Sequence, residues 1–341
     1  MTSTSSDTVK ASNNTTNRTV EDISDGKSFV VAHLSDPHIA RVDQINKGDL
    51  LSKRLFGYLR WKLKRRFEQS YELLTILHKD LQRSKPDHIA ITGDLTQLSL
   101  PAEFEKARDW LQSLGTPEQV TVIPGNHDTY VKTAWHQSFA LWLDYMLGDA
   151  QAQPAGSISS LAELFPTLRI RNRIALIGIS TAQPSAPHLA TGAIGADQLK
   201  KLESILKQLN DQRLFRIILI HHPPISGVVN WRRSLTDAQF LQTLLERYGA
   251  ELVLFGHAHK TAHGDLATPA GLIPVMGVPS ASSLRRSDAR RSSYCLYKIM
   301  SSAEGWNVQM EERVFSSGQH RFVGGRQQEF CTPAGRRKAF F

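Results

Sequence analysis

Short apolar runs recur along the chain and alternate with longer amphipathic stretches. The runs are rich in Val and Ile and too short for helices, which is typical of buried strands. They are SFVVAHL at 28–34, DHIAIT at 87–92, VTVI at 120–123, IALIGI at 174–179, FRIILI at 215–220 and LVLF at 252–255. Helical patterns lie between most of them, over 67–83, 102–114, 196–209 and 236–248. This alternation predicts an α/β domain with a largely parallel sheet and helices on its faces.

The two ends of the chain differ from this alternating region. Residues 1–27 are polar and offer almost nothing to bury, so they are predicted to form a disordered tail. The later runs at 294–300 and 306–315 predict antiparallel strands that complete a single domain over 28–315. Residues 316–341 are rich in Gly and Arg, and the prediction for them is a loose basic tail.

Composition narrows the kinds of partner and compartment. The 341 residues are 40% hydrophobic and carry a net charge of +9, which favours anionic partners such as phosphates, nucleic acid or acidic lipid. With two cysteines, Cys295 and Cys331, the chain has neither a disulfide framework nor a Cys-based zinc cluster. No apolar run resembles a signal peptide or reaches the roughly 18 residues of a membrane span, so we expect a cytoplasmic protein.

Polar clusters follow five of the predicted strands. They are Ser35-Asp36-Pro37-His38, Gly93-Asp94, Gly125-Asn126-His127-Asp128, His221-His222-Pro223-Pro224 and Gly256-His257-Ala258-His259. Each alone is weak evidence, because a Gly-Asp after a strand is usually a turn. Since ligands bind at the carboxyl ends of strands in open α/β sheets, we expect the five clusters to converge on one edge.

The residue types in these clusters suit divalent metals. Carboxylates, an Asn carbonyl and imidazoles form mixed oxygen and nitrogen ligand sets for Mn, Fe, Zn or similar ions. Asp94 stands alone in its cluster, and one carboxylate bridges two cations about 3.5–4 Å apart in two-metal hydrolases. The sequence therefore predicts two divalent metal ions.

The five clusters together resemble the calcineurin-like metallophosphoesterases. The pattern of that family is D-x-H, G-D, G-N-H-D/E, H and G-H-x-H, and every element occurs in order across 30–260. The resemblance implies a four-layer α-β-β-α sandwich, in which two packed mixed sheets are flanked by helices. It also implies a metal-dependent hydrolase that cleaves phosphodiester or pyrophosphate bonds by attack of metal-activated hydroxide.

The resemblance also implies a role for each matching residue. One metal is expected at Asp36, His38 and His259, the other at Asn126, His221 and His257, with Asp94 bridging the two. His127 is expected to stabilise developing charge or protonate the leaving oxygen, and Asp128 to orient His127. His222 is expected beside its neighbouring ligand or in contact with substrate. Outside the family motifs, Arg232 and Arg233 lie in the loop after His221-His222, where they either contact a second phosphate or the leaving group or are solvated surface arginines.

The sequence is compatible with more than one class of phosphate substrate. The Gly-Asn-His-Asp and His-His-Pro-Pro forms are similar to the small bacterial phosphodiesterases, including class III cyclic-nucleotide enzymes. A basic aromatic insertion at about 47–67 departs from that compact pattern, since residues 53–66 carry seven positive charges and no negative one. This insertion is similar in character to lipid-related pyrophosphatases such as UDP-2,3-diacylglucosamine hydrolases.

Three interpretations of residues 53–66 are compatible with their sequence. Helical periodicity places Phe56, Leu59, Leu63 and Phe67 on one stripe, with Tyr58 and Trp61 close to it. The segment is a surface helix that packs this stripe on the core, a peripheral contact with an anionic membrane at its inner face, or, less favoured, a contact with nucleic acid. A non-catalytic scaffold is the other alternative for the whole protein. Because all seven ligand positions and His127 are filled, a hydrolase is the favoured hypothesis.

Overall fold

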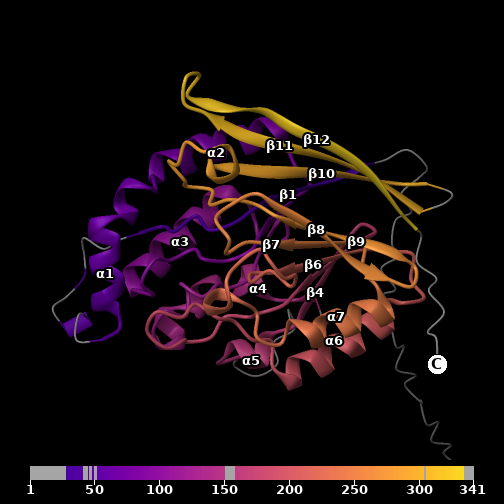
Figure 1. Ribbon diagram of the computed structural model, residues 1–341, viewed down its shortest axis with the longest axis horizontal. Coiled ribbons are helices and arrows are strands. Elements are labelled where there is room, and N and C mark those ends of the chain that lie inside the picture. Colours follow the sequence, from indigo (N-terminus) through magenta and orange to yellow (C-terminus); the bar gives the residue numbers. More distant parts are fainter. Residues whose placement is uncertain are drawn as a thin grey trace, which may run out of the picture.

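Two sheets of six strands each form the centre of the computed structural model, which describes residues 28–40, 45, 48–49, 52–149, 158–302 and 305–333 (Figure 1). In spatial order, the first sheet contains β12 (Arg321–Pro333), β11 (Gly305–Ser316), β10 (Ser293–Ser301), β1 (Ser28–Leu34), β2 (His88–Ile91) and β3 (Val120–Val122). β1, β2 and β3 are parallel, and β10 to β12 continue the sheet with antiparallel pairings.

The second sheet is parallel at its centre and antiparallel at both edges. Its spatial order is β4 (Thr167–Arg171), β5 (Ile174–Gly178), β6 (Phe215–Ile220), β7 (Leu252–Phe255), β9 (Gly271–Gly277) and β8 (Ala262–Thr268). β5, β6, β7 and β9 run parallel, while β4 and β8 pair antiparallel with their neighbours. The six strands predicted from the first apolar runs are all present.

The side chains of β6 show how the layers are packed. Successive residues of a strand face opposite sides. Phe215, Ile217 and Leu219 therefore belong to the core that includes the first sheet. Ile218 and Ile220 face the other way, into a second core formed with α6 (Ala196–Leu209) and α7 (Ala238–Tyr248).

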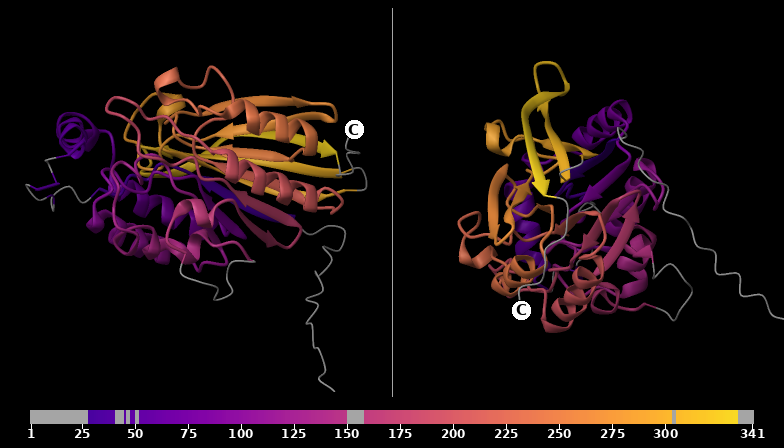
Figure 2. Two further views of the ribbon diagram at one scale, coloured as in Figure 1. Left: turned by 90° about the horizontal axis from the view of Figure 1, so that it is seen from below. Right: turned by 90° about the vertical axis from the view of Figure 1, so that its right-hand side faces the viewer.

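Helices α2 (Tyr71–Ser84) and α3 (Pro101–Leu114) contribute their apolar faces to the core of the first sheet. The Ser70 side chain accepts a hydrogen bond from the Glu72 backbone N–H at 3.2 Å and begins α2, and Pro101 occupies the first turn of α3. The order of layers is thus helix, sheet, sheet, helix, which confirms the predicted four-layer sandwich (Figures 1 and 2). The shorter helices are α1 (Arg54–Leu63), the 3-10 turn η3 (Arg65–Phe67), α4 (Leu143–Met146) and α5 (Leu161–Leu164).

The loose tail predicted from residue 316 is wrong over part of its length. Arg321–Pro333 forms β12, which pairs with β11 from Ser316↔Arg321 to Gly305↔Pro333. Phe322 is buried, and the Arg313 guanidinium beside it binds Asp80 on α2. The Gly-Gly pair within 321–333 interrupts the alternation of apolar and polar residues, so the sequence pattern does not reveal this strand. The predicted tail at 1–27 and residues 334–341 lie outside the described residues.

Candidate metal centre and active site

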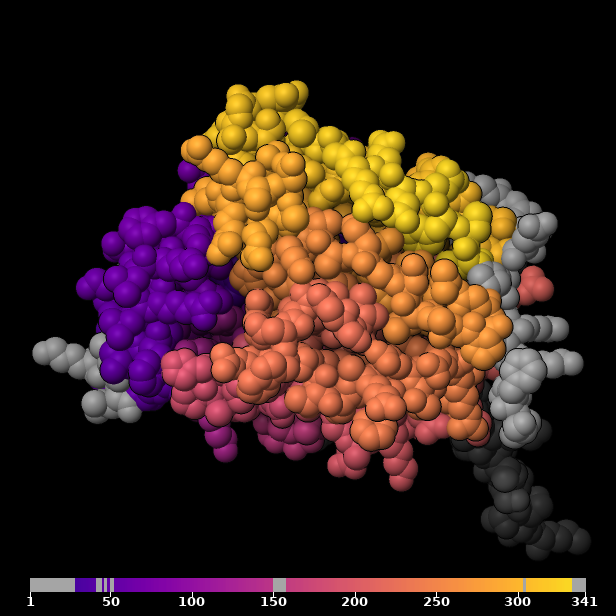
Figure 3. All heavy atoms as spheres, in the orientation of Figure 1, coloured from indigo at the N-terminus to yellow at the C-terminus, as the bar shows by residue number. Residues whose placement is uncertain are grey.

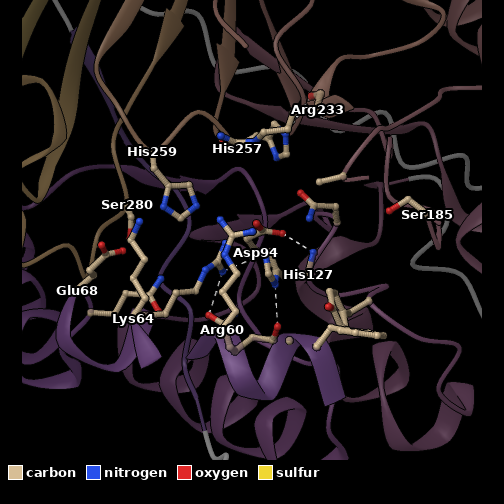
Figure 4. A pocket seen from close by; sticks show the side chains of 18 of the residues that line it. Arg60, Lys64, Glu68, Asp94, His127, Ser185, Arg233, His257, His259 and Ser280 are labelled. Atoms are coloured by element: carbon tan, nitrogen blue, oxygen red, sulfur yellow. Dashed lines mark hydrogen bonds between the residues drawn. The ribbon is translucent and has the colours of Figure 1, made fainter. Parts of the chain in front are cut away.

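The five polar clusters converge at the carboxyl ends of strands from both sheets. Two groups of side chains there place one ligand atom each within 4.8 Å of the others. The groups are Asp36, His38, Asp94 and His259, and Asp94, His221 and His257. Asp94 is common to both, and Figure 4 shows it between His127 and the His257 and His259 side chains.

Three side chains of the first group point at a common position. His259 Nε2 lies 3.1 Å from Asp36 Oδ1 and 3.1 Å from His38 Nε2. His38 Nε2 also lies 3.8 Å from Asp94 Oδ2. Two imidazole nitrogens and carboxylate oxygens that face one another at such distances form a donor set for a cation.

The second group uses the other oxygen of Asp94. His221 Nε2 lies 3.4 Å from Asp94 Oδ1 and 3.2 Å from Asn126 Oδ1, so the Asn126 carbonyl joins this group. The Asp94 carboxylate thus presents Oδ2 to one group and Oδ1 to the other. This is the arrangement that a bridging carboxylate requires.

Backbone carbonyls orient three of the imidazoles. Each ring donates its outer N–H to a carbonyl oxygen, because a carbonyl accepts and cannot donate. The partners are Thr96 for His38 at 3.2 Å, Thr92 for His221 at 2.6 Å and Arg233 for His257 at 3.0 Å. The opposite ring nitrogens therefore present lone pairs to the cluster.

His222 differs from its neighbour His221 in this respect. Its Nε2 donates to the Ala190 carbonyl at 3.2 Å, and its Nδ1 accepts from the Thr181 hydroxyl at 2.7 Å. Both ring nitrogens are occupied, and the ring packs against His257 with 4.3 Å between centroids. With both nitrogens occupied, His222 has none free to bind a metal, which favours His221 as the ligand. The His222 ring instead packs against the His257 ring and does not face the pocket.

The donor set has the electrostatic signature of a cation site. Asp36 Oδ1 and Asp94 Oδ2 are buried and accept no hydrogen bond in the described structure. Burial alone lowers the pKa of His221, yet the Asp94 carboxylate more than offsets this and raises that pKa to about 9. A buried carboxylate oxygen that accepts no hydrogen bond is costly, so these two oxygens and the imidazole lone pairs fit divalent metal ions.

Backbone conformation at the site is strained. Five non-glycine residues have φ in the left-handed region, namely Asp36 (53°), His38 (45°), Asp94 (58°), His257 (65°) and His259 (50°). Such conformations cost of order 1–3 kcal/mol each and cluster at functional sites. Gly125 allows its loop to approach the loop that carries Asp94, since a Cβ at position 125 would lie 2.3 Å from Asp94 Oδ1.

Asp128 has a different role from the one predicted. Its Oδ2 accepts hydrogen bonds from the backbone N–H groups of Asp94 at 2.9 Å and Gly125 at 2.8 Å. Its Oδ1 accepts from the Thr96 N–H at 2.8 Å and the Thr96 hydroxyl at 3.0 Å. Because all four bonds go to these loops, Asp128 joins the Asp94 and Gly125 segments and does not orient the His127 ring.

His127 is oriented by Gln97 and faces an arginine that the sequence did not single out. Its Nδ1–H donates to the Gln97 carbonyl at 2.7 Å, so its Nε2 accepts from Arg65 Nη1 at 3.0 Å. Burial, and next the charge of Arg65, lower the pKa of His127 to about 3. Arg65 belongs to the basic run at 53–66, and the charge of that run does not by itself reveal which of its side chains enters the site.

A pocket of about 450 Å³ opens over the metal-site residues. One of the two predicted loop arginines lines it: Arg233 does, whereas Arg232 is exposed and stacks on Trp231 with 5.1 Å to the ring centroid. Arg285 and Arg290, from the Ser-rich loop at 278–292 between β9 and β10, also line the pocket. The geometry therefore favours Arg233 over Arg232 as a substrate contact.

A four-layer α/β fold with two metal-ligand groups sharing one carboxylate defines a metallohydrolase. The family model for calcineurin-like phosphoesterases matches residues 29–261. The chain belongs to the calcineurin-like phosphoesterase family and is a metal-dependent hydrolase of phosphoric esters.

Individual relatives support this assignment. The chain is 27% identical over 206 residues to a probable cyclic nucleotide phosphodiesterase of Synechococcus, covering 59% of this chain and 67% of that protein. It is 26% identical over 240 residues to a probable glycerophosphodiester phosphodiesterase of Arcobacter nitrofigilis, covering 69% of this chain and 73% of that one. A dimetal phosphatase from Danio rerio has a similar fold, with a TM-score of 0.57 at 11% identity over 90% of this chain and 99% of that chain.

Proposed function

We propose that this protein is a phosphodiesterase with a dinuclear metal centre held by seven residues. The ligands are Asp36, His38 and His259 for one ion, Asn126, His221 and His257 for the other, and Asp94 for both. The observation that carries the proposal is the Asp94 carboxylate, which turns one oxygen toward each group. The named relatives, which include cyclic-nucleotide and glycerophosphodiester phosphodiesterases, favour a diester as substrate.

The bound metals would activate water as nucleophile and neutralise charge on the phosphoryl oxygens. The residues around them perform the remaining tasks. Arg65 lies against His127 beside Asp94, where its guanidinium supplies positive charge to the leaving oxygen. His127 accepts a hydrogen bond from Arg65 and holds it in place, and Arg233 contacts the substrate from the opposite side of the pocket (Figure 4).

A side-by-side assay tests this function. The purified protein with added Mn²⁺ is given a phosphomonoester, an aryl phosphodiester, cyclic AMP, glycerophosphocholine and UDP-2,3-diacylglucosamine. We expect diesters to be hydrolysed with a higher kcat/KM than the monoester. Activity confined to the monoester contradicts the proposal, and activity confined to the UDP-sugar lipid replaces the diester with a pyrophosphate.

A second candidate function is contact with an anionic membrane. The side chains that α1 and η3 expose to solvent favour it. The apolar stripe Phe56, Leu59, Leu63 and Phe67 does not pack on the core: these side chains are 56%, 44%, 77% and 64% exposed. The opposite face, with Tyr58 and Trp61, packs on the cluster around Leu98 and Leu100 instead. The helix stands at one end of the molecule (Figure 3, indigo). Exposed apolar side chains flanked by Lys and Arg are typical of segments that bind anionic lipid surfaces.

No helix within the described ranges is both long and apolar enough to cross a bilayer, so the contact proposed is peripheral. Sedimentation with vesicles of phosphatidylglycerol and phosphatidylcholine tests it. We expect wild-type protein to sediment with the anionic vesicles and Leu63→Ser/Phe67→Ser to remain in the supernatant. Trp231→Ser, which removes an exposed aromatic elsewhere, is the control. Equal sedimentation of all three proteins would remove the membrane proposal.

A further inference from the structure

The pocket over the metal centre has a strongly cationic wall. Its lining includes Lys53, Arg60, Lys64, Arg65, Arg233, Arg285 and Arg290. The acidic side chains in the same lining are Glu68 and Asp94, and Asp94 faces the metal groups. A volume of about 450 Å³ matches a nucleotide-sized molecule. The seven cationic side chains outnumber the two acidic ones, and this excess of positive charge lies in the pocket wall around the metal-site residues.

Most of these cations have no carboxylate partner. Arg285 binds Glu68 at 2.9 Å. Among the described residues, the other six lie beyond 4.0 Å from any carboxylate, and those with hydrogen bonds use neutral acceptors. Lys53 donates to the Ser185 carbonyl at 2.7 Å, and Arg233 donates to the His257 carbonyl. Arg60 and Lys64 are exposed and the other four cations are partly buried. Cationic side chains that line one pocket favour an anionic ligand, because their electrostatic potentials add there.

Four of the six come from three separate segments of the chain and line the pocket together. Arg60 and Lys64 rise from the α1 side of the pocket, and Arg233 lies across from them (Figure 4). Arg290 completes the group from the Ser-rich loop. Four cations thus line one pocket, whose acidic lining side chains are Glu68, which binds Arg285, and Asp94. Such crowding of like charge is relieved when an anion binds between them.

A simple phosphodiester does not need this group. It carries one negative charge, and the two divalent ions over which it would lie already exceed that charge. We propose that Arg60, Lys64, Arg233 and Arg290 form a second-anion subsite, so that the preferred substrate is a phosphodiester bearing an additional phosphate group. This inference rests on the proposed function, because it places the scissile phosphate at the metal centre.

A pair of substrates that differ in one phosphate tests the subsite. Thymidine 5′-(p-nitrophenyl phosphate) has the scissile diester alone, and its 3′-phosphorylated analogue has the same leaving group and one more anion. One charge-assisted hydrogen bond corresponds to roughly tenfold or more in affinity, so we expect wild-type kcat/KM to be at least about tenfold higher for the analogue.

Two matched variants locate the effect on the pocket side of the basic segment. Arg60→Gln/Lys64→Gln should reduce the preference for the phosphorylated analogue to below about threefold. Lys62→Gln/Arg66→Gln removes the same charge from the same segment, outside the pocket lining, and should retain the preference. Equal kcat/KM for both substrates in wild type, or equal preference in both variants, would overturn the subsite.

Calorimetry separates failure of the subsite from failure of the proposed function. Thymidine 3′,5′-bisphosphate and thymidine 5′-phosphate are titrated into Mn²⁺-loaded protein without any turnover. We expect the bisphosphate to bind about tenfold more tightly than the monophosphate in wild type and in Lys62→Gln/Arg66→Gln. In Arg60→Gln/Lys64→Gln this difference in affinity should disappear. If neither ester is hydrolysed but this difference remains, the phosphodiesterase proposal fails alone. Equal binding of the two nucleotides overturns the subsite even when the diester is hydrolysed.

Discussion

At the scale of single residues, Asp94 has the most demanding position in the site. It contributes an oxygen to each ligand group, and its Oδ1 also accepts the His127 backbone N–H at 2.7 Å. Asp94→Asn replaces one of these oxygens with an NH₂ group that cannot bind a cation. We expect bound metal and turnover to fall by at least about a hundredfold, since even residues that merely orient ligands change metal affinity by 10–100-fold. Elemental analysis after dialysis, with an aryl diester assay, measures both.

His127 should behave differently from Asp94, because its ring nitrogens bond to Gln97 and Arg65 and to none of the proposed metal ligands. His127→Ala should retain the metal content of the wild type while kcat falls by about 10²–10³-fold, the cost of one misplaced donor, because Arg65 loses the acceptor that holds it in place. Metal analysis and steady-state kinetics on one preparation give both values. A loss of metal as large as in Asp94→Asn would show that His127 acts through the metal centre.

At the scale of elements, the convergence of the proposed ligands at one edge was predictable and the position of Arg65 was not. Asp36, Asn126 and His221 follow apolar runs directly, and parallel strands bring such residues to one edge. Arg65 follows α1 instead, and its direction depends on how Tyr58 and Trp61 pack against the Leu98 and Leu100 cluster. The stripe chosen from helical periodicity is exposed, because Gly57 fits against Leu98 and Tyr130 and so draws the other helix face inward.

A buried ion pair joins β6 to the segment before β7, and its loss should destabilise the fold. Arg216 Nη2 donates to Glu251 Oε1 and Arg216 Nε to Glu251 Oε2, at 2.8 and 2.9 Å, with both side chains nearly inaccessible. Glu251→Gln leaves the Arg216 charge buried without a counterion. We expect the free energy of unfolding to fall by about 3–5 kcal/mol. Urea unfolding followed by circular dichroism measures this change.

The exposed pair of Arg108 and Asp109 is the control for that measurement, with 37% and 62% of the side chains exposed. Asp109→Asn should change the free energy of unfolding by less than about 1 kcal/mol, because solvent screens exposed charges. If Glu251→Gln has an equally small effect, the buried pair contributes no more to stability than a surface pair.

At the scale of the whole molecule, the sequence predicts the strands better than their order. Val31 of β1 pairs with Tyr297 of β10, from opposite ends of the chain, and such a pairing leaves no local trace in the sequence. The two-sheet sandwich followed from the family resemblance and not from periodicity. β12 was missed for a related reason: its pairing with β11 and the burial of Phe322 stabilise a segment whose own pattern is weak.

Packing two sheets face to face also encloses histidines away from the active site, and this makes global stability depend on pH. His88 on β2 is 1% exposed and its Nε2 lies 2.8 Å from the Thr121 hydroxyl. Burial, and then the charges of Arg169 and Arg171, lower its pKa from 6.5 to about 3. The unfolded chain therefore binds a proton at this residue below about pH 6.5 that the folded chain binds only near pH 3. Stability contributed by the neutral ring is present above pH 6.5 and is lost as the pH falls toward 3.

His88→Gln removes this proton from the unfolded state. Between pH 4 and 6, the slope of the free energy of unfolding against pH should decrease by up to about 1.4 kcal/mol per pH unit, the value for one proton. Urea unfolding of both proteins across this range gives the two slopes. At pH 8 the imidazole is neutral in both states, so the difference there measures the change in packing alone. Parallel pH profiles for the two proteins would mean that His88 is protonated equally in the folded and unfolded chains, and would contradict the lowered pKa attributed to its burial beside Thr121 of β3.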